Sequence, residues 1–335
     1  MKRNVVIDLL RFFAALFVVF FHLYGCGPKM NNWYFKIVCN GWTGVPIFFV
    51  ISGYCVTLSA HKSKSSIDFI FRRFFRIFPL YWVSLLFSFF FLIIRKSIIG
   101  VNSIAHIPHT FLELIYNIFN LTLPFSKVEP INWVYWTLTV ELFFYLMIYL
   151  SAIFNKKFNV YIIAIITIAS FFNYLSLFQP LFFLEYWPAF GIGSALFLTQ
   201  KNQGFQKIFS ILLLILNVVA LFFANKSQGN VPYIIVVLIT VALIFFSEYI
   251  TIKENFISKL GDYSYGVYLL HVPLGVYCIG SFKENLIKGN LLLRILIDII
   301  LYLITLFLSR YLYRWIEKPA VAFGNTVNKK YFQNN

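Results

Sequence analysis

Three ionisable residues in one apolar run could act together in proton chemistry. Asp8, Arg11 and His22 lie in the run near 5–25. At about 100° per residue, the eleven steps from Arg11 to His22 return to within about 20° of one direction, and Asp8 falls within about 60° of both. Because the unperturbed pKa of histidine lies close to neutrality, we predict that His22 is a general base. The simpler alternatives are a buried Asp8–Arg11 pair that fixes helix packing and a His22 side chain that reaches the membrane interface.

A second group of cations lies further along the chain. Arg72, Arg73 and Arg76 occur in RRFFRIFPLYW. On a helix, like charges three and four residues apart repel by a few tenths of a kcal/mol per pair, and a bound anion would relieve this repulsion. The planar guanidinium suits phosphates, so we predict a clamp for a phosphorylated donor. The alternative is ordinary anchoring against lipid headgroups.

Two of the other ionisable residues inside predicted membrane spans lie where a specific role can be weighed. A charge at the bilayer centre costs on the order of 3 kcal/mol, so each needs a partner or a function. Glu141 lies roughly eight residues from the outer end of its span, about 12 Å deep, which can approach the level of His22. For Glu141 we weigh a catalytic role against structural pairing. We interpret His271, near Tyr265 and Tyr268, as a structural, hydrogen-bonded histidine.

The elements that must position these residues are predicted to be transmembrane helices. The 335-residue chain is 60% apolar and 12% charged, with a mean hydropathy of +0.79, which excludes an ordinary soluble enzyme. The apolar runs lack two-residue alternation, so we predict an all-α integral membrane protein, a polytopic bundle of about ten transmembrane helices. These runs lie near 5–25, 43–60, 78–98, 134–153, 159–177, 181–199, 207–225, 231–249, 262–281 and 291–313. We place the segment 106–123 as interfacial or re-entrant.

The distribution of basic residues indicates the orientation. With a cytoplasmic N-terminus, that side holds eighteen of the 28 Lys and Arg residues and the opposite side eight. Cytoplasmic loops hold such an excess, and an even number of spans places both termini in the cytoplasm. We therefore attribute the net charge of +16 to the basic residues that orient the chain in membrane lipid. We expect no nucleic-acid partner, because no basic surface is interleaved with aromatic residues.

The chain is predicted to form a single domain. We expect a transmembrane domain over 1–320, a short cytoplasmic tail over 321–335 and no fused soluble domain. No His, Cys or Asp residues have metal-ligand spacing, so no metal is expected. Cys26 and Cys39 could pair if their loop faces an oxidising compartment. The sequence does not indicate the oligomeric state.

Together these residues resemble the motifs of the membrane-bound acyltransferase-3 family. Arg11 and His22 reproduce its arginine, ten residues, histidine signature, and Asp8 its preceding acid. The run 44–53 resembles the second-helix motif, with Pro46 where many members carry Asp. The run 136–145 resembles the tryptophan-to-glutamate motif, with Leu142 where members often carry a second acid. The other matches, which are the basic loop, the late motif and the usual ending, are Arg73, Arg76, Pro79, Tyr81, Trp82, Leu260, Gly261, Ser264, Tyr265, Tyr268, Leu269, His271, Val272, Pro273, Glu317, Lys318 and Pro319.

Members of this family typically O-acylate surface carbohydrates. The resemblance implies an O-acyltransferase, most simply an O-acetyltransferase, of the bacterial plasma (inner) membrane. It would take an acyl group from cytoplasmic acyl-CoA, expected to be acetyl-CoA, as co-substrate, with no permanently bound cofactor. The acceptor would be a hydroxyl of a surface polysaccharide or its lipid-linked precursor.

The resemblance also implies a role for each matching residue. Coenzyme A phosphates would lie on the arginine cluster, and the pantetheine arm would bring the thioester toward His22. Glu141 would either orient the His22 ring or accept the proton from it. The donor-binding residues would be Arg11, Arg72, Arg73, Arg76 and Trp82, with Asp8, Tyr265 and His271 in support. Whether an acyl-histidine forms or the sugar attacks directly stays open.

Two other classes of function fit the same residues. A lipid-linked glycan transporter also needs buried arginines and aromatic walls, but it would release no CoA. A membrane sensor or scaffold would need Arg73 and Arg76 for insertion and not for small-molecule binding.

Overall fold

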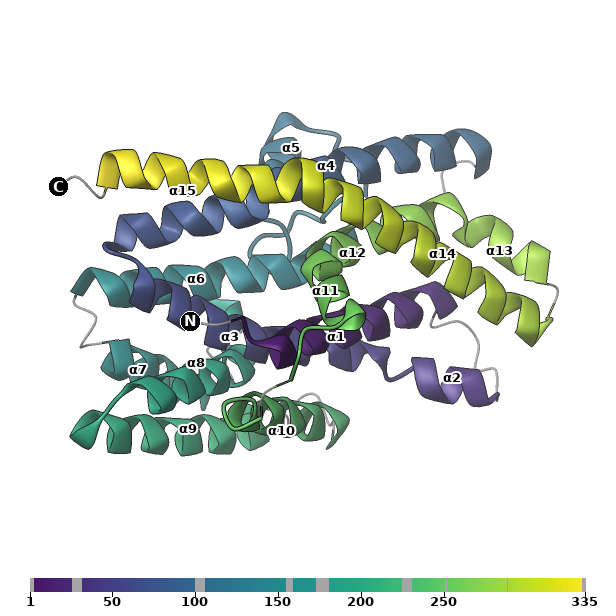
Figure 1. Cartoon of the computed structure of the whole chain (residues 1–335). Helices are drawn as coiled ribbons and strands as arrows, with labels where there is room; N and C mark the ends of the chain where they lie inside the picture. Colours follow the sequence, from purple (N-terminus) through teal and green to yellow (C-terminus); the bar gives the residue numbers. More distant parts are fainter. Residues whose placement is uncertain are drawn as a thin grey trace.

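A computed structural model describes residues 3–25, 32–99, 106–154, 159–172, 181–224, 231–250, 252–287 and 289–332. In these ranges the chain forms helices and turns, with no strand. Most long helices run roughly along one common direction in a single bundle (Figure 1). The helices α14 and α15 form a long rod along one edge of the bundle, beside α4, and α7 to α10 gather at the opposite edge.

The α-helical segments follow the apolar runs closely at most positions. They are α1 (Val5–Tyr24), α2 (Trp33–Val38), α3 (Gly44–Lys62), α4 (Ser66–Ile99), α5 (Phe111–Ile118), α6 (Trp136–Phe154), α7 (Asn159–Ser170), α8 (Trp187–Lys201), α9 (Gly204–Ala224), α10 (Val231–Phe246), α11 (Phe256–Leu260), α12 (Ser264–His271), α13 (Gly280–Ile287), α14 (Leu291–Leu312) and α15 (Lys318–Phe332). Two π-helical turns, η7 (Val272–Cys278) and η8 (Tyr313–Glu317), follow α12 and α14.

The expected number of spans is not confirmed. Among the described residues, six helical segments are long and apolar enough to cross a membrane: Val5–Tyr24, Trp33–Lys62, Ser66–Ile98, Trp133–Ile153, Gly204–Phe223 and Leu291–Val327. The other four predicted spans contain the shorter helices α7, α8, α10 and α12, of 12, 15, 16 and 8 residues. A crossing helix needs roughly 20 apolar residues, and within the described residues these four helices are shorter than that.

The segment 106–123 contains one short helix. At eight residues, α5 is too short to span a membrane. Asn117 at its end is fully buried, and its side chain donates to the carbonyl of Glu113 and accepts from the backbone N–H of Ile131 at 2.9 Å. The hydroxyl of Tyr81 on α4 also donates to the Asn117 carbonyl. The segment is thus a folded-back piece packed on α4.

A close helix contact fixes α3 in the centre of the bundle. A Cβ atom at Gly53 would lie 2.0 Å from the carbonyl oxygen of Phe190 on α8, and one at Gly193 would lie 2.0 Å from that of Val50. Only glycine at both positions permits this approach, because any side chain would overlap the opposing backbone. The packing therefore sets the position of α3, which carries several cavity residues.

The described part of the tail is helical. Residues 318–332 form α15, which continues the rod of α14 past η8 and packs along α4 (Figure 1). The rings of Phe75 and Phe323 lie 5.5 Å apart at this contact. The predicted tail thus begins inside an element that supports α4. Cys26 lies outside the described residues, and so does its pairing with Cys39.

Candidate active site

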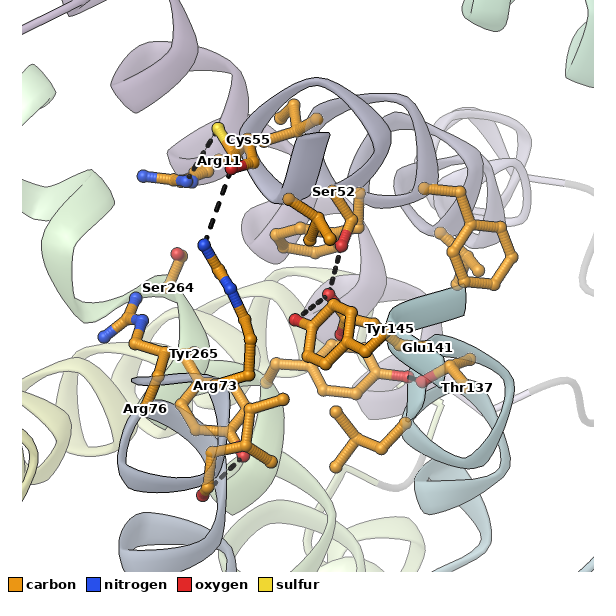
Figure 2. A pocket seen from close by; sticks show the side chains of 18 residues that line it. Arg11, Ser52, Cys55, Arg73, Arg76, Thr137, Glu141, Tyr145, Ser264 and Tyr265 are labelled. Carbon is orange, nitrogen blue, oxygen red and sulfur yellow. Dashed lines mark hydrogen bonds between the residues drawn. The ribbon is translucent and has the colours of Figure 1, made fainter. Parts of the chain in front are cut away.

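A cavity of about 120 Å³ lies between α1, α3, α4, α6 and α12. Five predicted site residues line it: Arg11, Arg73, Arg76, Glu141 and Tyr265 (Figure 2). The three guanidinium groups lie toward one side, and the Glu141 carboxylate lies toward the other. Helices that are distant in sequence thus bring together most of the predicted donor-binding residues.

Two hydroxyl groups hold Glu141 within the cavity. Its Oε1 accepts a hydrogen bond from the Tyr145 hydroxyl at 2.7 Å and another from the Ser52 hydroxyl (Figure 2). Ser52 and Tyr145 both lie in the motifs quoted above, but the linear sequence does not indicate that they meet. Glu141 is therefore hydrogen-bonded to α3 and to its own helix, and its expected role toward the His22 ring stays a prediction.

The predicted Asp8–Arg11 pair is present. Arg11 Nη1 lies 3.5 Å from Asp8 Oδ1, and Arg11 Nη2 donates to Cys55 Sγ at 3.4 Å. Arg3, which sequence reasoning missed, also binds Asp8 at 2.5 Å. Although partial burial acts to lower it, the pKa of Arg3 is raised by the carboxylates of Asp8 and Asp262. The paired carboxylate anchors the first turn of α1 and directs Arg11 toward the cavity.

Arg73 has an incompletely satisfied guanidinium. Its Nη2 donates to the Cys55 carbonyl at 3.5 Å, and its Cζ lies 5.6 Å from the ring centre of Tyr145. Its buried Nε has no hydrogen-bond partner in the part of the chain that the structure describes. A buried donor without a partner costs about 1–3 kcal/mol. An anionic oxygen bound in the cavity would remove this penalty.

Arg76 is held from a distant segment. It forms an ion pair with Glu317 of η8, and its Cζ lies 5.9 Å from the ring centre of Tyr265. The Tyr265 hydroxyl donates to the Ile77 carbonyl at 3.0 Å. The C-terminal Glu-Lys-Pro motif therefore supplies a carboxylate to the site, a role that the linear sequence does not indicate.

A second hollow, of about 220 Å³, lies where α3 ends and α4 begins. Arg72 lines this basic hollow and not the inner cavity, because Asp68 and Asn325 hold its side chain at 2.6 and 3.1 Å. Cys55 and Arg73 line both spaces. The complete lining of the basic hollow is Cys55, Leu58, Ser59, Lys62, Ser63, Arg72 and Arg73.

Trp82 is not part of either space. Its indole N–H donates to the Ile118 carbonyl of α5 at 3.0 Å, and its side chain is exposed. Trp82 lies nine positions after Arg73, which at about 100° per residue places the two on opposite faces of α4. Trp82 therefore lies apart from both spaces, and its contact with the donor stays a prediction.

His22 is paired with His271. Nδ1 of His22 lies 2.9 Å from Nε2 of His271, with the ring centroids 5.0 Å apart and the ring planes inclined by 28°. Neither ring lines the cavity, whereas Tyr268, one turn before His271, does and lies 5.7 Å from the His271 ring. The histidine pair thus lies next to a lining residue of the cavity without lining the cavity itself.

The protein family accounts for this arrangement of residues. The sequence model described as an acyltransferase domain, that of the acyltransferase-3 family, matches residues 4–314. The chain belongs to the acyltransferase-3 family. It is 26% identical to the O-acetyl transferase of Shigella phage Sf6, over 95% of this chain and 96% of that protein. It is 34% identical to nodulation protein 10 of Rhizobium leguminosarum bv. viciae, over 42% of this chain and 41% of that protein. No solved structure matches. The chain is an integral-membrane acyltransferase.

In this acyltransferase, a buried polar network fixes the end of α1 that carries His22. Lys283 donates to the Leu23 carbonyl and pairs with Asp298, while Arg294 donates to the Tyr24 carbonyl at 3.1 Å. The last carbonyls of a helix lack backbone donors, and cations interact favourably with them. The network therefore stabilises the turn that holds the histidine. Within the described ranges, no three His, Cys, Asp or Glu side chains gather as metal ligands.

Proposed function

We propose that the protein transfers an acyl group, most simply acetyl, from acyl-CoA on the cytoplasmic side of the bacterial inner membrane to a carbohydrate hydroxyl on the far side. The N-terminus and C-terminus would both lie in the cytoplasm. The observation that carries this proposal is the pair of adjoining cationic spaces that share Arg73 and Cys55. In this proposal the donor would enter through the basic hollow and extend through the inner cavity toward Tyr268, which contacts the histidine pair.

The basic hollow suits the charged head of the donor. Lys62, Arg72 and Arg73 line it, and arginine binds phosphate oxygens through paired N–H groups. The inner cavity is narrow, and an anionic head would be costly to bury there. We therefore assign the phosphates to the hollow and the neutral pantetheine arm to the cavity, with Arg11 and Arg76 beside the arm.

The transfer step would take place beyond the cavity, at His22. The acceptor hydroxyl gives its proton to the imidazole while its oxygen forms a bond to the thioester carbonyl carbon. The carbon–sulfur bond then breaks, and the leaving CoA thiolate takes the proton from the His22 imidazolium, which returns the ring to its neutral form. Tyr268 separates the cavity from the histidines, so its ring must shift to let the thioester pass.

A relative supports oxygen as the atom that accepts the acyl group. The phage Sf6 protein, which aligns over nearly its whole length, is named an O-acetyl transferase. That name supports transfer to oxygen and an acetyl donor. A carbohydrate, free or lipid-linked, offers hydroxyl groups at the membrane surface, where the outer end of α1 would place His22.

Labelled acyl transfer tests the proposal. Membranes containing the protein receive [¹⁴C]acetyl-CoA, and label is counted in surface polysaccharide and in the lipid-linked fraction, while free CoA is measured by chromatography. We expect CoA release and ester label that depend on the protein. CoA release without any carbohydrate label would contradict the acceptor, and the absence of both would contradict acyl-CoA as the donor.

A variant tests the role of His22 in the same assay. His22→Ala should lower transfer by about 10²–10⁴-fold, the usual contribution of a general base. His109→Ala is the matched control, because that histidine is exposed in the loop before α5. A folded, inserted His22→Ala protein with full activity would exclude His22 as the base.

A further inference from the structure

The hydrogen bonds of His271 define where its proton lies. Its Nδ1 is 2.6 Å from the Tyr268 carbonyl oxygen and 3.3 Å from that of Val267. A carbonyl oxygen can only accept, so Nδ1 of His271 must carry a hydrogen. In the neutral ring, Nε2 then holds the lone pair and acts as an acceptor.

The Tyr268 carbonyl lies three residues before His271, within reach of its ring. In an α-helix the partner of this carbonyl is the N–H of Val272, four residues on, and the oxygen has a second lone pair for the imidazole N–H of His271, 2.6 Å away. Pro273 lacks an N–H, so it cannot bond the Leu269 carbonyl four residues before it, and Asn132 donates to that carbonyl at 3.3 Å.

The proton on His271 determines the proton on His22. The 2.9 Å contact joins Nε2 of His271 to Nδ1 of His22, and one hydrogen must lie between them. Because Nε2 of neutral His271 accepts, Nδ1 of His22 must donate. The remaining nitrogen of neutral His22, Nε2, then holds its lone pair.

We propose that His271 is a positioning residue that holds His22 in the tautomer protonated at Nδ1, so that Nε2 of His22 is the atom that takes the proton from the acceptor hydroxyl. This inference rests on the proposed function only in naming His22 as the base. His271 is fully buried, and α12 packs directly on α1, so its ring has a defined orientation. A base whose other nitrogen is hydrogen-bonded to a fixed group needs no reorientation during reaction.

The arrangement also stabilises the product of proton uptake. When Nε2 of His22 takes the hydroxyl proton, the ring becomes an imidazolium and its Nδ1–H becomes a charge-assisted donor to His271. His271 remains neutral and keeps its own donor on the Tyr268 carbonyl. The series from carbonyl to His271 to His22 thus orients the base without a carboxylate.

Nuclear magnetic resonance of ¹⁵N-histidine-labelled protein in lipid nanodiscs tests the tautomers directly. The chain has five histidines, and the spectra of His22→Gln and His271→Gln assign the two rings of the pair. With both rings neutral, we expect protonated Nδ1 and unprotonated Nε2 in each. Protonation at Nε2 in either neutral ring would overturn the proposal, and this readout on the unaltered protein needs no active enzyme.

Kinetics separate positioning from simple packing. His271→Leu keeps an apolar side chain of similar bulk but removes the acceptor, so kcat for acyl transfer should fall about 10–100-fold, as for the loss of other orienting partners, with the donor KM unchanged. His271→Gln offers an amide oxygen to Nδ1 of His22 and should restore most of this loss. Equal activity of the Leu and Gln variants, at any level, would contradict the positioning role.

The control and the two assays keep the inferences apart. His109→Ala removes one resonance, and we expect it to leave both the remaining spectrum and transfer unchanged. Full activity of His22→Ala would remove the proposed base but leave the tautomer result standing. An inactive His22→Ala together with an Nε2-protonated His22 ring would refute only the inference about His271.

Discussion

Arg73 is the residue on which donor binding should depend most. It lines both the inner cavity and the basic hollow, and its buried Nε lacks a hydrogen-bond partner among the described residues. Arg73→Gln removes the charge and the paired N–H groups of the guanidinium. The KM for acetyl-CoA should therefore rise about 10–100-fold, which corresponds to the 1.5–3 kcal/mol of a hydrogen bond to a charged group. Arg73→Lys keeps the charge and should lie between. Steady-state kinetics in detergent or nanodiscs measure both.

Arg310 provides the matched control for Arg73. It is exposed on α14, outside both hollows, so Arg310→Gln should leave the donor KM unchanged. A similar rise in both variants would mean that arginine loss acts through insertion and not through donor binding, as the membrane-anchoring alternative requires.

Glu141 should contribute more to cavity structure than to proton transfer. Glu141→Gln keeps an acceptor for Ser52 and Tyr145, so we expect nearly wild-type unfolding and a transfer rate within about tenfold of wild type. Glu141→Leu leaves both hydroxyls without their acceptor and should lower the free energy of unfolding by about 1–3 kcal/mol. Thermal unfolding followed by tryptophan fluorescence measures this difference. A loss in Glu141→Gln as large as in His22→Ala would instead make Glu141 catalytic.

At the scale of residues, the sequence predicted the members of the site better than their partners. Helical periodicity placed Asp8 and Arg11 on one face, and the structure pairs them. It could not predict that Ser52 meets Glu141, because the two lie 89 residues apart on different helices and their contact depends on which helices pack together. His271 is hydrogen-bonded, as the sequence predicts, but for the same reason the sequence could not identify His22 as its partner.

At the scale of elements, the contact of α3 with α8 should limit stability. Gly53→Ala or Gly193→Ala places a methyl group against the opposing backbone, so each should lower the free energy of unfolding by about 1–3 kcal/mol, as overpacking usually does. Because α3 carries Ser52 and Cys55, transfer activity should also fall. Unfolding in detergent and the acyl-transfer assay measure the two effects.

A third glycine tests whether this effect is specific to the helix contact. A Cβ at Gly280 would meet its nearest neighbour, the Val276 side chain, at 3.6 Å, an ordinary contact. Gly280→Ala should therefore leave stability unchanged or slightly raise it, since alanine favours helix. Equal destabilisation of Gly280→Ala and Gly53→Ala would show that the loss does not come from the α3–α8 approach.

Element boundaries were less predictable from sequence than element positions. Within the described residues, four of the ten apolar runs contain helices shorter than the roughly 20 residues of a crossing helix. For α12 the reason is visible in the sequence, since Pro273 lies two residues after His271 and the chain continues as a π-helical turn. Hydropathy does not register such a change, because it measures the apolarity of a window and not its hydrogen bonding.

At the scale of the whole molecule, distant segments assemble the site. The rod of α14 and α15 brings Glu317 and Asn325 to the arginines of α4, nearly at the end of the chain (Figure 1). The basic hollow and α15 therefore belong to the same end of the bundle. If that end faces acyl-CoA, the C-terminus must face the cytoplasm, so membrane orientation becomes a test of the route proposed for the donor.

Cysteine labelling measures this orientation. In a chain without its other cysteines, Cys39 between α2 and α3 should react with a membrane-impermeant maleimide on intact cells or spheroplasts. Ile252→Cys, exposed in the loop between α10 and α11, should react only after permeabilisation. This orientation is expected because eighteen Lys and Arg residues would lie on the cytoplasmic side and eight on the opposite side. Ile252→Cys leaves every charge in place. Labelling in the reverse order would put the basic hollow on the side that lacks cytoplasmic acyl-CoA and would exclude the proposed donor route.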